Sequence, residues 1–239
     1  INHEKLLAKI NTSPTYTKQI KAWLKAGVID KRDWFATSEG TPQGGSISPL
    51  LANIALHGME QIIEEAFPSD KTGRLRNSRK LYGYRVRKPQ LFRYADDFVL
   101  LCEELSIVEK SKILISEWLS EIGLELKPSK TRTTHTLNCH NEQAPGFNFL
   151  GFTIRQFPVG KRHSGKNGQG QLLGFKTIIE PSKEKVKEHY EALAEIISQF
   201  KGKSQAELIG KLNPIIRGWC NYQTPWNSKR TFGRVKSLV

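Results

Sequence analysis

The sequence is poor in cysteine and has no long apolar run. Its cysteines, Cys102, Cys139 and Cys220, are odd in number, widely spaced and without the pairing of a metal site. A disulfide framework and a structural zinc site are therefore not expected, and we expect reduced thiols. No apolar run reaches membrane-spanning length, and the first residues lack the charged and apolar regions of a signal peptide. We expect a soluble, intracellular protein with no membrane partner.

Acidic residues are also scarce, so the chain is strongly basic. Its formal net charge is +14 and its pI is about 9.7. This charge favours a partner with a dense phosphate backbone, because each neutralised phosphate releases condensed counterions. No acid occurs between Asp70 and Asp96, and we interpret the intervening residues 71–93, the basic segment, as a loop that faces nucleic acid. A merely solvated loop is the alternative.

The chain nevertheless has enough apolar residues to fold. It has 239 residues, of which 38% are hydrophobic. A chain of this length forms one large domain or two smaller ones, each with a real core. A disordered polycation is therefore not expected.

Residues 92–98 read Phe-Arg-Tyr-Ala-Asp-Asp-Phe and place Asp96 and Asp97 between two apolar runs. Such runs, broken by a short acidic turn, predict a β-hairpin with two carboxylates at its tip. Adjacent carboxylates repel one another, and Mg²⁺ can offset that cost because it prefers oxygen ligands and usually keeps phosphate oxygens and waters. Phosphoryl transfer is the first chemistry to consider. The alternative is a pair that only caps a tight turn.

Apolar spacing and turn residues predict the elements of the first half of the chain. They indicate two short helices before Gly27 and a helix from Pro49 to about Ala66. A further helix over residues 108–122 should end at Gly123. Together with the hairpin, these helices predict an α+β domain.

The second half is predicted to begin with strands and end with helices. Strands are expected at residues 124–127, 131–136 and 147–154, and a glycine-rich hairpin loop at 160–170. Ser182 and Ser204 are expected to cap two helices. Pro214 should kink or divide the second of them.

Two features leave alternatives open. The pair Gly44-Gly45 is either a plain loop or a place where a backbone or base lies close to the protein. Trp219 and Tyr222, which lie among basic residues, either stack on nucleic acid or close a small helical core.

Four motifs, in order, carry a resemblance to a known family. They are Gly40-Thr-Pro-Gln-Gly-Gly-Ser-Ile-Ser-Pro-Leu, Tyr94-Ala-Asp-Asp97, Gly123-Leu-Glu-Leu-Lys-Pro-Ser-Lys130 and Phe149-Leu-Gly-Phe152. Together they resemble the central and later motifs of a reverse transcriptase. The closing run, Leu212-Asn-Pro-Ile-Ile-Arg-Gly-Trp-Cys-Asn-Tyr222, resembles the thumb, or maturase domain, of proteins encoded by group II introns.

The resemblance implies a right-hand polymerase of the α+β class. Part of the fingers and the palm, with an antiparallel sheet and packed helices, are expected over residues 1–180, and a helical thumb, or maturase domain, over residues 181–239. Asp96 and Asp97 correspond to palm carboxylates that carry catalysis and bind Mg²⁺ in a two-metal site.

The resemblance also assigns contacts with substrates. Gln43, Gly44 and Gly45, together with Tyr94 and Ala95, correspond to residues beside the template, the primer end and the incoming nucleotide. Lys130 corresponds to a lysine that donates a proton to the pyrophosphate or pairs with its charge. The alternative is a solvated lysine in a turn. Phe149, Leu150 and Gly151 match the primer grip. The residues expected to contact RNA or duplex are Arg74, Arg76, Arg79, Lys80, Arg85, Arg87, Lys88, Arg217, Trp219, Tyr222, Lys229 and Arg230.

One departure from the family concerns the start of the chain. In the family, another metal-binding aspartate lies just before a segment resembling residues 1–7, and the fingers precede it. We expect that this carboxylate comes from outside the segment, that the chain belongs to a longer protein, and that it is inactive alone.

Two functions follow from the resemblance. One is RNA-directed DNA synthesis during retrohoming, with dNTPs, an RNA template/DNA primer duplex and target DNA as partners. The other is a maturase that binds group II intron RNA and assists its splicing. We expect one protein to do both, in a ribonucleoprotein of the bacterial cytoplasm or an organelle. The alternatives are a maturase without polymerase activity, or a diversity-generating, retron or CRISPR-associated reverse transcriptase.

Overall fold

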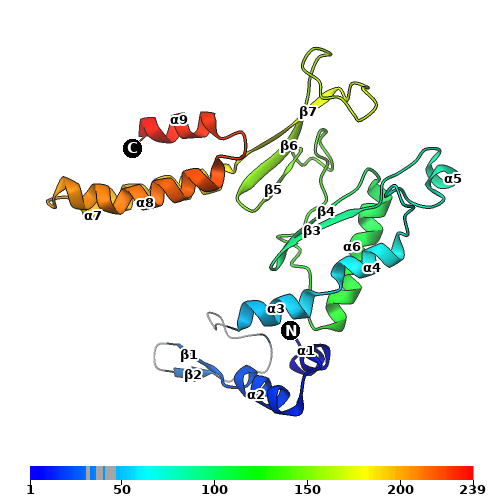
Figure 1. The fold of residues 1–239 in the computed structure, drawn as a ribbon, viewed down its shortest axis with the longest axis horizontal. Coiled ribbons are helices and arrows are strands. Elements are labelled where there is room, and N and C mark those ends of the chain that lie inside the picture. The colour runs from blue at the N-terminus through cyan, green and yellow to red at the C-terminus, as the bar shows by residue number, and fades with distance from the viewer. Residues whose placement is uncertain (31–32, 36–39, 41–46, 239) are drawn as a thin grey trace. The chain divides into compact units, whose positions relative to one another are not determined.

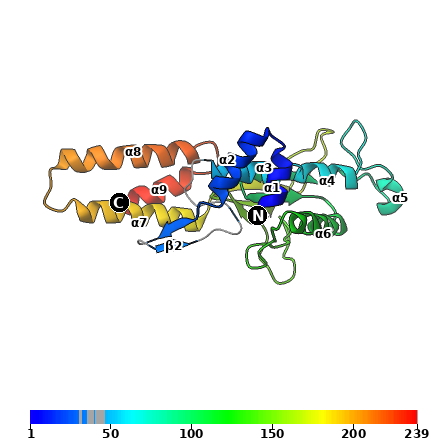
Figure 2. The same ribbon diagram turned by 90° about the horizontal axis from the view of Figure 1, so that it is seen from below.

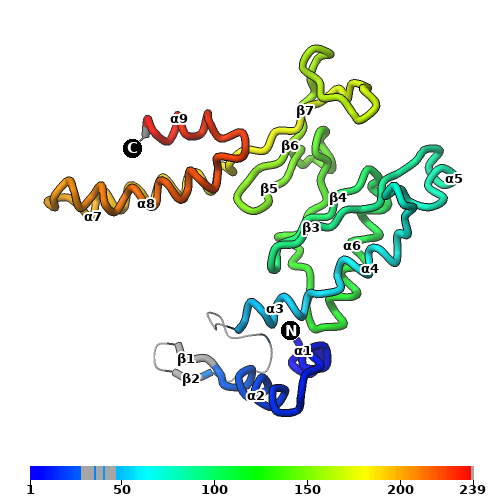
Figure 3. Tube along the Cα trace, in the orientation of Figure 1, coloured from blue at the N-terminus to red at the C-terminus, as the bar shows by residue number. Residues whose placement is uncertain are grey.

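The computed structural model describes residues 1–30, 33–35, 40 and 47–238, and Figure 3 traces the chain through them. The chain forms two compact units, Ile1–Thr133 and Thr134–Val239, called here the amino-terminal and carboxy-terminal units. Helices and small antiparallel sheets occur together, which confirms the predicted α+β class.

The amino-terminal unit begins with the two predicted short helices and contains the predicted hairpin (Figure 1). Its strands form two separate antiparallel pairs, β1 with β2 and β3 with β4. Its elements are α1 (His3–Ile10), α2 (Pro14–Leu24), β1 (Val28–Asp30), β2 (Asp33–Phe35), α3 (Ser48–Leu56), α4 (Met59–Ala66), α5 (Ser78–Tyr82), β3 (Gln90–Tyr94), β4 (Asp97–Leu101) and α6 (Leu105–Glu121).

The helix predicted from Pro49 to Ala66 is wrong in one respect, because it is two helices, α3 and α4. Gly58 adopts φ +99°, a left-handed conformation that interrupts the helix. The Lys9 ammonium of α1 donates hydrogen bonds to the carbonyl oxygens of Ala55 and His57. These carbonyls lie where α3 ends and intrahelical partners run out, so Lys9 compensates for the break. Burial lowers the pKa of Lys9, and the nearby Arg93 charge lowers it further.

Two apolar clusters hold this unit together. Leu6, Leu24 and Leu51 bring α1, α2 and α3 together in the first. In the second, Ile63 of α4 and Ile115 of α6 form a core against which Leu91, Phe98 and Leu100 of the hairpin pack. One face of the hairpin is therefore anchored on helices.

Helix α6 ends at Glu121, and Gly123 forms the left-handed cap that was predicted for it. The Gly123 amide donates to the Ser120 carbonyl and the Leu124 amide donates to the Leu119 carbonyl, the bonds of a Schellman cap. Gly123 has φ +72°, and a Cβ there would lie 3.0 Å from the Asn2 backbone nitrogen. Because Asn2 N–H also donates to the Ile122 carbonyl, the cap fixes the start of α1 beside the end of α6.

The strands predicted at residues 124–127 and 131–136 are wrong. The chain does turn at residues 128–130, where the Lys130 amide donates to the Lys127 carbonyl. The flanking residues form no named strand. Leu124 and Leu126 instead pack on the core of the amino-terminal unit, so apolar burial accounts for their pattern.

The carboxy-terminal unit contains a three-stranded antiparallel sheet in the order β5-β6-β7. Its strands are β5 (Phe147–Phe149), β6 (Phe152–Pro158) and β7 (Phe175–Pro181). The single strand predicted over residues 147–154 is wrong, because Leu150 (φ +49°) and Gly151 (φ +79°) reverse the chain into a hairpin. The predicted loop at 160–170 does connect two antiparallel strands, β6 and β7.

Three helices follow: α7 (Lys183–Gln199), α8 (Gln205–Gln223) and α9 (Lys229–Leu238). Ser182 and Ser204 cap α7 and α8 as predicted, each accepting a hydrogen bond from the backbone three residues on. Figure 2 shows α7 and α8 running antiparallel along one another. Pro214 lies inside α8 without dividing it. The sequence pattern did not indicate α9.

No helix in the described part of the chain is both long enough and apolar enough to cross a membrane.

Two isoleucines of α6 test the core of the amino-terminal unit. Ile115 is 2% exposed, whereas Ile113 on the opposite side is 58% exposed. We expect Ile115→Ala to lower the free energy of unfolding by about 2–5 kcal/mol, because it leaves a cavity. Ile113→Ala is the matched control, with an expected change within about 0.5 kcal/mol. Urea unfolding measures both, and equal effects would contradict the assignment of this core.

Candidate functional site

The predicted acidic hairpin is present in the amino-terminal unit. Tyr94 pairs with Asp97, so that Ala95 and Asp96 alone form the turn between β3 and β4. Asp96 and Asp97 are both exposed, and Tyr94 beside them is 65% exposed. The structure thus confirms the predicted hairpin and presents both carboxylates to solvent.

The turn has a strained backbone. Ala95 has φ +53°, in a region that glycine enters freely. For a residue with a Cβ this conformation costs roughly 1–2 kcal/mol. Such strain persists where neighbouring groups determine the conformation, and it is concentrated at functional sites.

Sequence reasoning missed Arg93, which it grouped with the bases of the basic segment. The Arg93 side chain is 16% exposed and lies near Glu60 of α4. The alternation of β3 could have indicated this, because Leu91 and Arg93 lie on the same face and Leu91 packs on the core.

The acidic turn fits magnesium as a partial ligand set. Carboxylate oxygens are hard donors, and Mg²⁺ is commonly held by one or two of them together with phosphates and waters. No cluster of three or more His, Cys, Asp or Glu side chains suited to a metal occurs in the described residues. Asp96 and Asp97 would therefore need phosphate oxygens, waters or further ligands to complete a site.

The other residues predicted to contact template and nucleotide are only partly described. Gln43, Gly44 and Gly45 lie outside the described residues. Lys130 is exposed in the turn after α6. Both interpretations of Lys130, as a substrate contact and as a solvated lysine, remain predictions.

Some cations of the basic segment have partners within the protein, and others are exposed without an ion pair and are called here the open cations. Lys88 forms an ion pair of 2.6 Å with Glu64, and Arg87 one of 4.0 Å with Glu103. Arg74 donates to the Arg85 carbonyl. The remaining bases of the RNA-binding prediction in this segment are exposed and form no ion pair with any described residue: Arg76, Arg79, Lys80 and Arg85.

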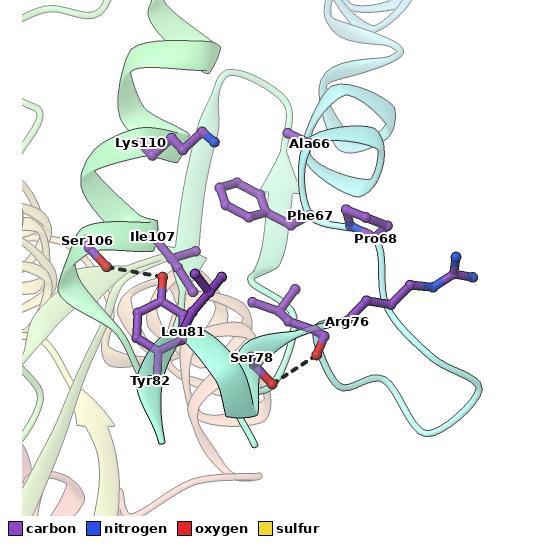
Figure 4. Close-up of a pocket in the computed structure, with 11 residues that line it drawn as sticks. Ala66, Phe67, Pro68, Arg76, Ser78, Leu81, Tyr82, Ser106, Ile107 and Lys110 are labelled. Atoms are coloured by element: carbon purple, nitrogen blue, oxygen red, sulfur yellow. Dashed lines mark hydrogen bonds between the residues drawn. The ribbon is translucent and has the colours of Figure 1, made fainter. Parts of the chain in front are cut away.

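A cavity of about 300 Å³ lies beside the basic segment (Figure 4). Phe67 and Tyr82 supply aromatic walls, and Arg76 and Lys110 supply the cations. The Tyr82 hydroxyl lies 3.4 Å from the Ser106 hydroxyl. None of the lining residues belongs to the acidic turn, so the cavity and the carboxylates are separate features.

The predicted primer grip is the turn between β5 and β6. Leu150, a bulky residue, adopts φ +49° there. The Tyr222 hydroxyl of α8 donates to the Leu150 carbonyl at 2.9 Å, and the Ser182 amide donates to the Gly151 carbonyl at 2.9 Å. The Tyr222 ring lies 5.3 Å from the Phe152 ring. Helix α8 thus fixes the turn.

The aromatic residues of the last helices have partners within the carboxy-terminal unit. Trp219 is stacked on His189, with ring centroids 4.3 Å apart, and meets Phe232 edge to face. Burial lowers the pKa of His189, which favours the neutral ring in this stack. Trp219 therefore helps close the helical core, while its predicted contact with RNA stays a prediction.

The bases predicted to bind RNA in the same unit do face solvent. Arg217 on α8 and Lys229 and Arg230 at the start of α9 are all exposed. An exposed base is free to contact phosphate, and each phosphate that it neutralises releases counterions.

Comparison with known proteins identifies the family. Residues 1–154 match the family described as "Reverse transcriptase (RNA-dependent DNA polymerase)", and this match covers more than half of the chain. The chain belongs to the reverse transcriptase family. Residues 186–239 match the "Group II intron, maturase-specific domain". The predicted resemblance is confirmed.

Three individual relatives are similar to the chain, and the names of two of them refer to introns. The chain is 27% identical to the Group II intron-encoded protein LtrA of Lactococcus lactis subsp. cremoris, over 93% of the chain and 46% of the relative. It is 26% identical to the "Uncharacterized 91 kDa protein in cob intron" of Schizosaccharomyces pombe, over 93% of the chain and 33% of the relative. It is 33% identical to Protein YkfC of Escherichia coli K12, over 55% and 36% respectively. The chain spans less than half the length of these relatives.

The open cations of the basic segment give a testable prediction. We expect the double variant Arg79→Gln/Lys80→Gln of this reverse transcriptase to bind RNA more weakly. The slope of log affinity against log salt should fall by about one for each phosphate that the variant no longer neutralises. Titrations at several salt concentrations measure this slope.

Lys88→Gln is the matched control, because the Lys88 ammonium is already occupied by Glu64. We expect it to keep the wild-type slope. A double variant with an unchanged slope would remove Arg79 and Lys80 from the RNA interface.

The hydrogen bond from Tyr222 gives a second prediction. Tyr222→Phe keeps the ring but removes the hydrogen bond to Leu150, at a cost of about 0.5–1.5 kcal/mol. We therefore expect hydrogen exchange of the peptide spanning residues 147–153 to become roughly 2- to 12-fold faster. RNA affinity should stay near wild type in Tyr222→Phe, because stacking needs only the ring.

Tyr222→Ala completes this comparison. If Tyr222 also stacks on RNA, affinity falls in the alanine variant alone. Unchanged exchange in Tyr222→Phe would show that the hydroxyl does not hold the turn.

Proposed function

We propose that the full-length protein is a group II intron reverse transcriptase and maturase. It binds intron RNA, assists splicing and reverse splicing into DNA, and copies the intron by RNA-templated DNA synthesis. Its partners are intron RNA, target DNA, the template–primer duplex and dNTPs. The observation that carries the polymerase part is the exposed acidic turn of residues 94–97 within the segment that matches the reverse transcriptase family.

The acidic turn is suited to phosphoryl transfer by its position. Asp96 and Asp97 end a hairpin whose other face is anchored on α4 and α6, so the carboxylates stand on a rigid element. A site on such an element holds its groups in place better than one on a free loop. Tyr94 is exposed beside the carboxylates, where a primer end or base pair could rest.

Asp96 and Asp97 are the residues of this chain that would hold Mg²⁺. When bound, the metal supplies Lewis acidity that lowers the pKa of the attacking hydroxyl and balances charge on the triphosphate. The two carboxylates contribute negative charge and oxygen ligands, and a third carboxylate comes from outside this segment. Phe149, Leu150 and Gly151 would position the primer strand, since α8 holds their turn in place.

The maturase part rests on the carboxy-terminal helices. Residues 186–239 match the maturase-specific domain, and Arg217, Lys229 and Arg230 are exposed there. A protein that binds only the native fold of an RNA shifts the RNA population toward that fold. Splicing assistance therefore needs no protein active site.

The palm and thumb divide the chain at about residue 180 in this proposal. The reverse transcriptase match ends at residue 154 and the maturase match begins at residue 186, which supports a boundary between them. The sheet β5-β6-β7 lies in the same compact unit as the helices α7, α8 and α9. In this proposal the last strands of the palm therefore belong to the same compact unit as the thumb.

A maturase without polymerase activity is the second candidate. It would need the exposed bases but not the acidic pair, so the intact Asp96-Asp97 turn favours the polymerase. Diversity-generating, retron and CRISPR-associated reverse transcriptases share the palm motifs, and the match to the maturase-specific domain favours the intron protein over them.

The test is Asp96→Asn in the full-length protein with its intron RNA and Mg²⁺. We expect cDNA synthesis to be abolished, because the turn loses a ligand and a negative charge. RNA affinity and splicing should stay near wild type, since they depend on other surfaces. Primer extension and splicing are scored together.

Glu125→Gln, which neutralises an exposed carboxylate elsewhere in the amino-terminal unit, is the control and should keep both activities. Primer extension that persists in Asp96→Asn would refute the assignment of the turn. A wild-type protein that assists splicing without any cDNA synthesis would favour the second candidate.

A further inference from the structure

Arg93 has the least exposed side chain of the three bases of the basic segment that form ion pairs with described residues. It is the last of these bases, directly before Tyr94, and its side chain is 16% exposed. By comparison, Arg87 on the approach to β3 is 72% exposed. A largely buried guanidinium is of little use to an RNA backbone and must be satisfied by the protein itself.

The guanidinium makes contacts on two sides. Its Nη1 donates to the side-chain oxygen of Asn53 at 2.9 Å and to the backbone carbonyl of Ala95 at 3.0 Å. Its Nε lies 3.5 Å from a carboxylate oxygen of Glu60. Asn53 is on α3 and Glu60 on α4, so one side chain joins the hairpin to the helices on both sides of the break at Gly58.

The Ala95 carbonyl is the decisive contact. It belongs to the peptide that links Ala95 to Asp96, and Ala95 is the residue with φ +53°. A hydrogen bond to this oxygen fixes the plane of the peptide that leads into the acidic pair. A strained conformation persists only when its surroundings determine it, and here Arg93 provides that constraint.

We propose that Arg93 is a positioning residue that sets the geometry of Asp96 and Asp97 through the Ala95 carbonyl. Its contacts connect the turn to the helices α3 and α4, and it does not contact the substrate. This inference rests on the proposed polymerase function of the turn. It goes beyond that function because it assigns the orientation of the carboxylates to a residue outside the acidic motif.

Lysine is the variant that separates positioning from charge. Arg93→Lys keeps a cation that can pair with Glu60, but one ammonium nitrogen cannot occupy both the Nε and the Nη1 positions. A lysine that pairs with Glu60 therefore keeps the positive charge beside α4, while the turn loses its hydrogen bond. Asn53→Ala is the second variant, because it removes the hydrogen bond between Arg93 and α3 and leaves the arginine in place.

The experiment uses the full-length protein with a template–primer duplex. We expect Arg93→Lys to lower the maximal rate of primer extension by between about tenfold and a hundredfold, the scale of a small misplacement of catalytic groups. The KM for dNTP, the RNA affinity and the thermal unfolding midpoint should stay near wild type. Asn53→Ala should change the rate in the same direction by less.

A binding readout makes the test independent of activity. Mn²⁺ binding, followed by electron paramagnetic resonance with Mn²⁺ alone as the probe, should weaken several-fold in Arg93→Lys. Lys187→Met is the control, since it removes a cation that pairs with Glu191 on α7 and should leave the rate and Mn²⁺ affinity unchanged.

Wild-type rate and Mn²⁺ affinity in Arg93→Lys would overturn the proposal, and so would a decrease that follows RNA affinity and the unfolding midpoint in both variants. If the wild-type protein makes no cDNA, or Asp96→Asn still does, the proposed function fails instead. An active wild type, an inactive Asp96→Asn and an unaffected Arg93→Lys would reject the inference alone.

Discussion

The acidic turn of the amino-terminal unit and the predicted primer grip of the carboxy-terminal unit each depend on a residue with left-handed backbone. Ala95 precedes the acidic pair and Leu150 lies in the predicted primer grip, and both have positive φ without being glycine. In each case the carbonyl oxygen of the strained residue accepts a hydrogen bond from a side chain of another position, Arg93 for Ala95 and Tyr222 for Leu150. The two turns are thus held by the same physical device. The residues that hold them lie outside the short motifs by which the turns are recognised.

Local patterns predicted the elements whose causes are local. The acidic hairpin follows from two apolar runs around a two-residue turn, and α7 and α8 follow from their serine caps. Elements that depend on distant partners were missed. Lys9 stabilises the end of α3 from 46 residues away, and Tyr222 holds the β5–β6 turn from 72 residues away. No window of sequence around Gly58 or Leu150 contains those partners.

The functional residues likewise include some that the local sequence predicted and others whose surroundings depend on packing. Sequence alone predicted a hairpin with Asp96 and Asp97 at its tip, because two apolar runs around a short acidic turn are a local signal, and the hairpin is present. It could not distinguish bases that face solvent from bases engaged by the protein, since the same residue types serve both. Arg93 and Lys88 are held by Glu60 and Glu64, while other bases of the basic segment stay open. The residue type shows that a base can bind phosphate or a carboxylate, and only the packing around it shows which of the two is within reach.

In the proposed function, the acidic turn binds a divalent metal in the working protein. Fe²⁺ in place of Mg²⁺ gives a test of this binding, because Fe²⁺ with peroxide and ascorbate generates radicals that cut the peptide chain close to the bound ion. In the full-length protein with a template–primer duplex, we expect cleavage at or beside residues 94–97, suppressed by excess Mg²⁺ and by Asp96→Asn. Cleavage confined to other segments, or cleavage at the turn that neither Mg²⁺ nor Asp96→Asn reduces, would contradict it.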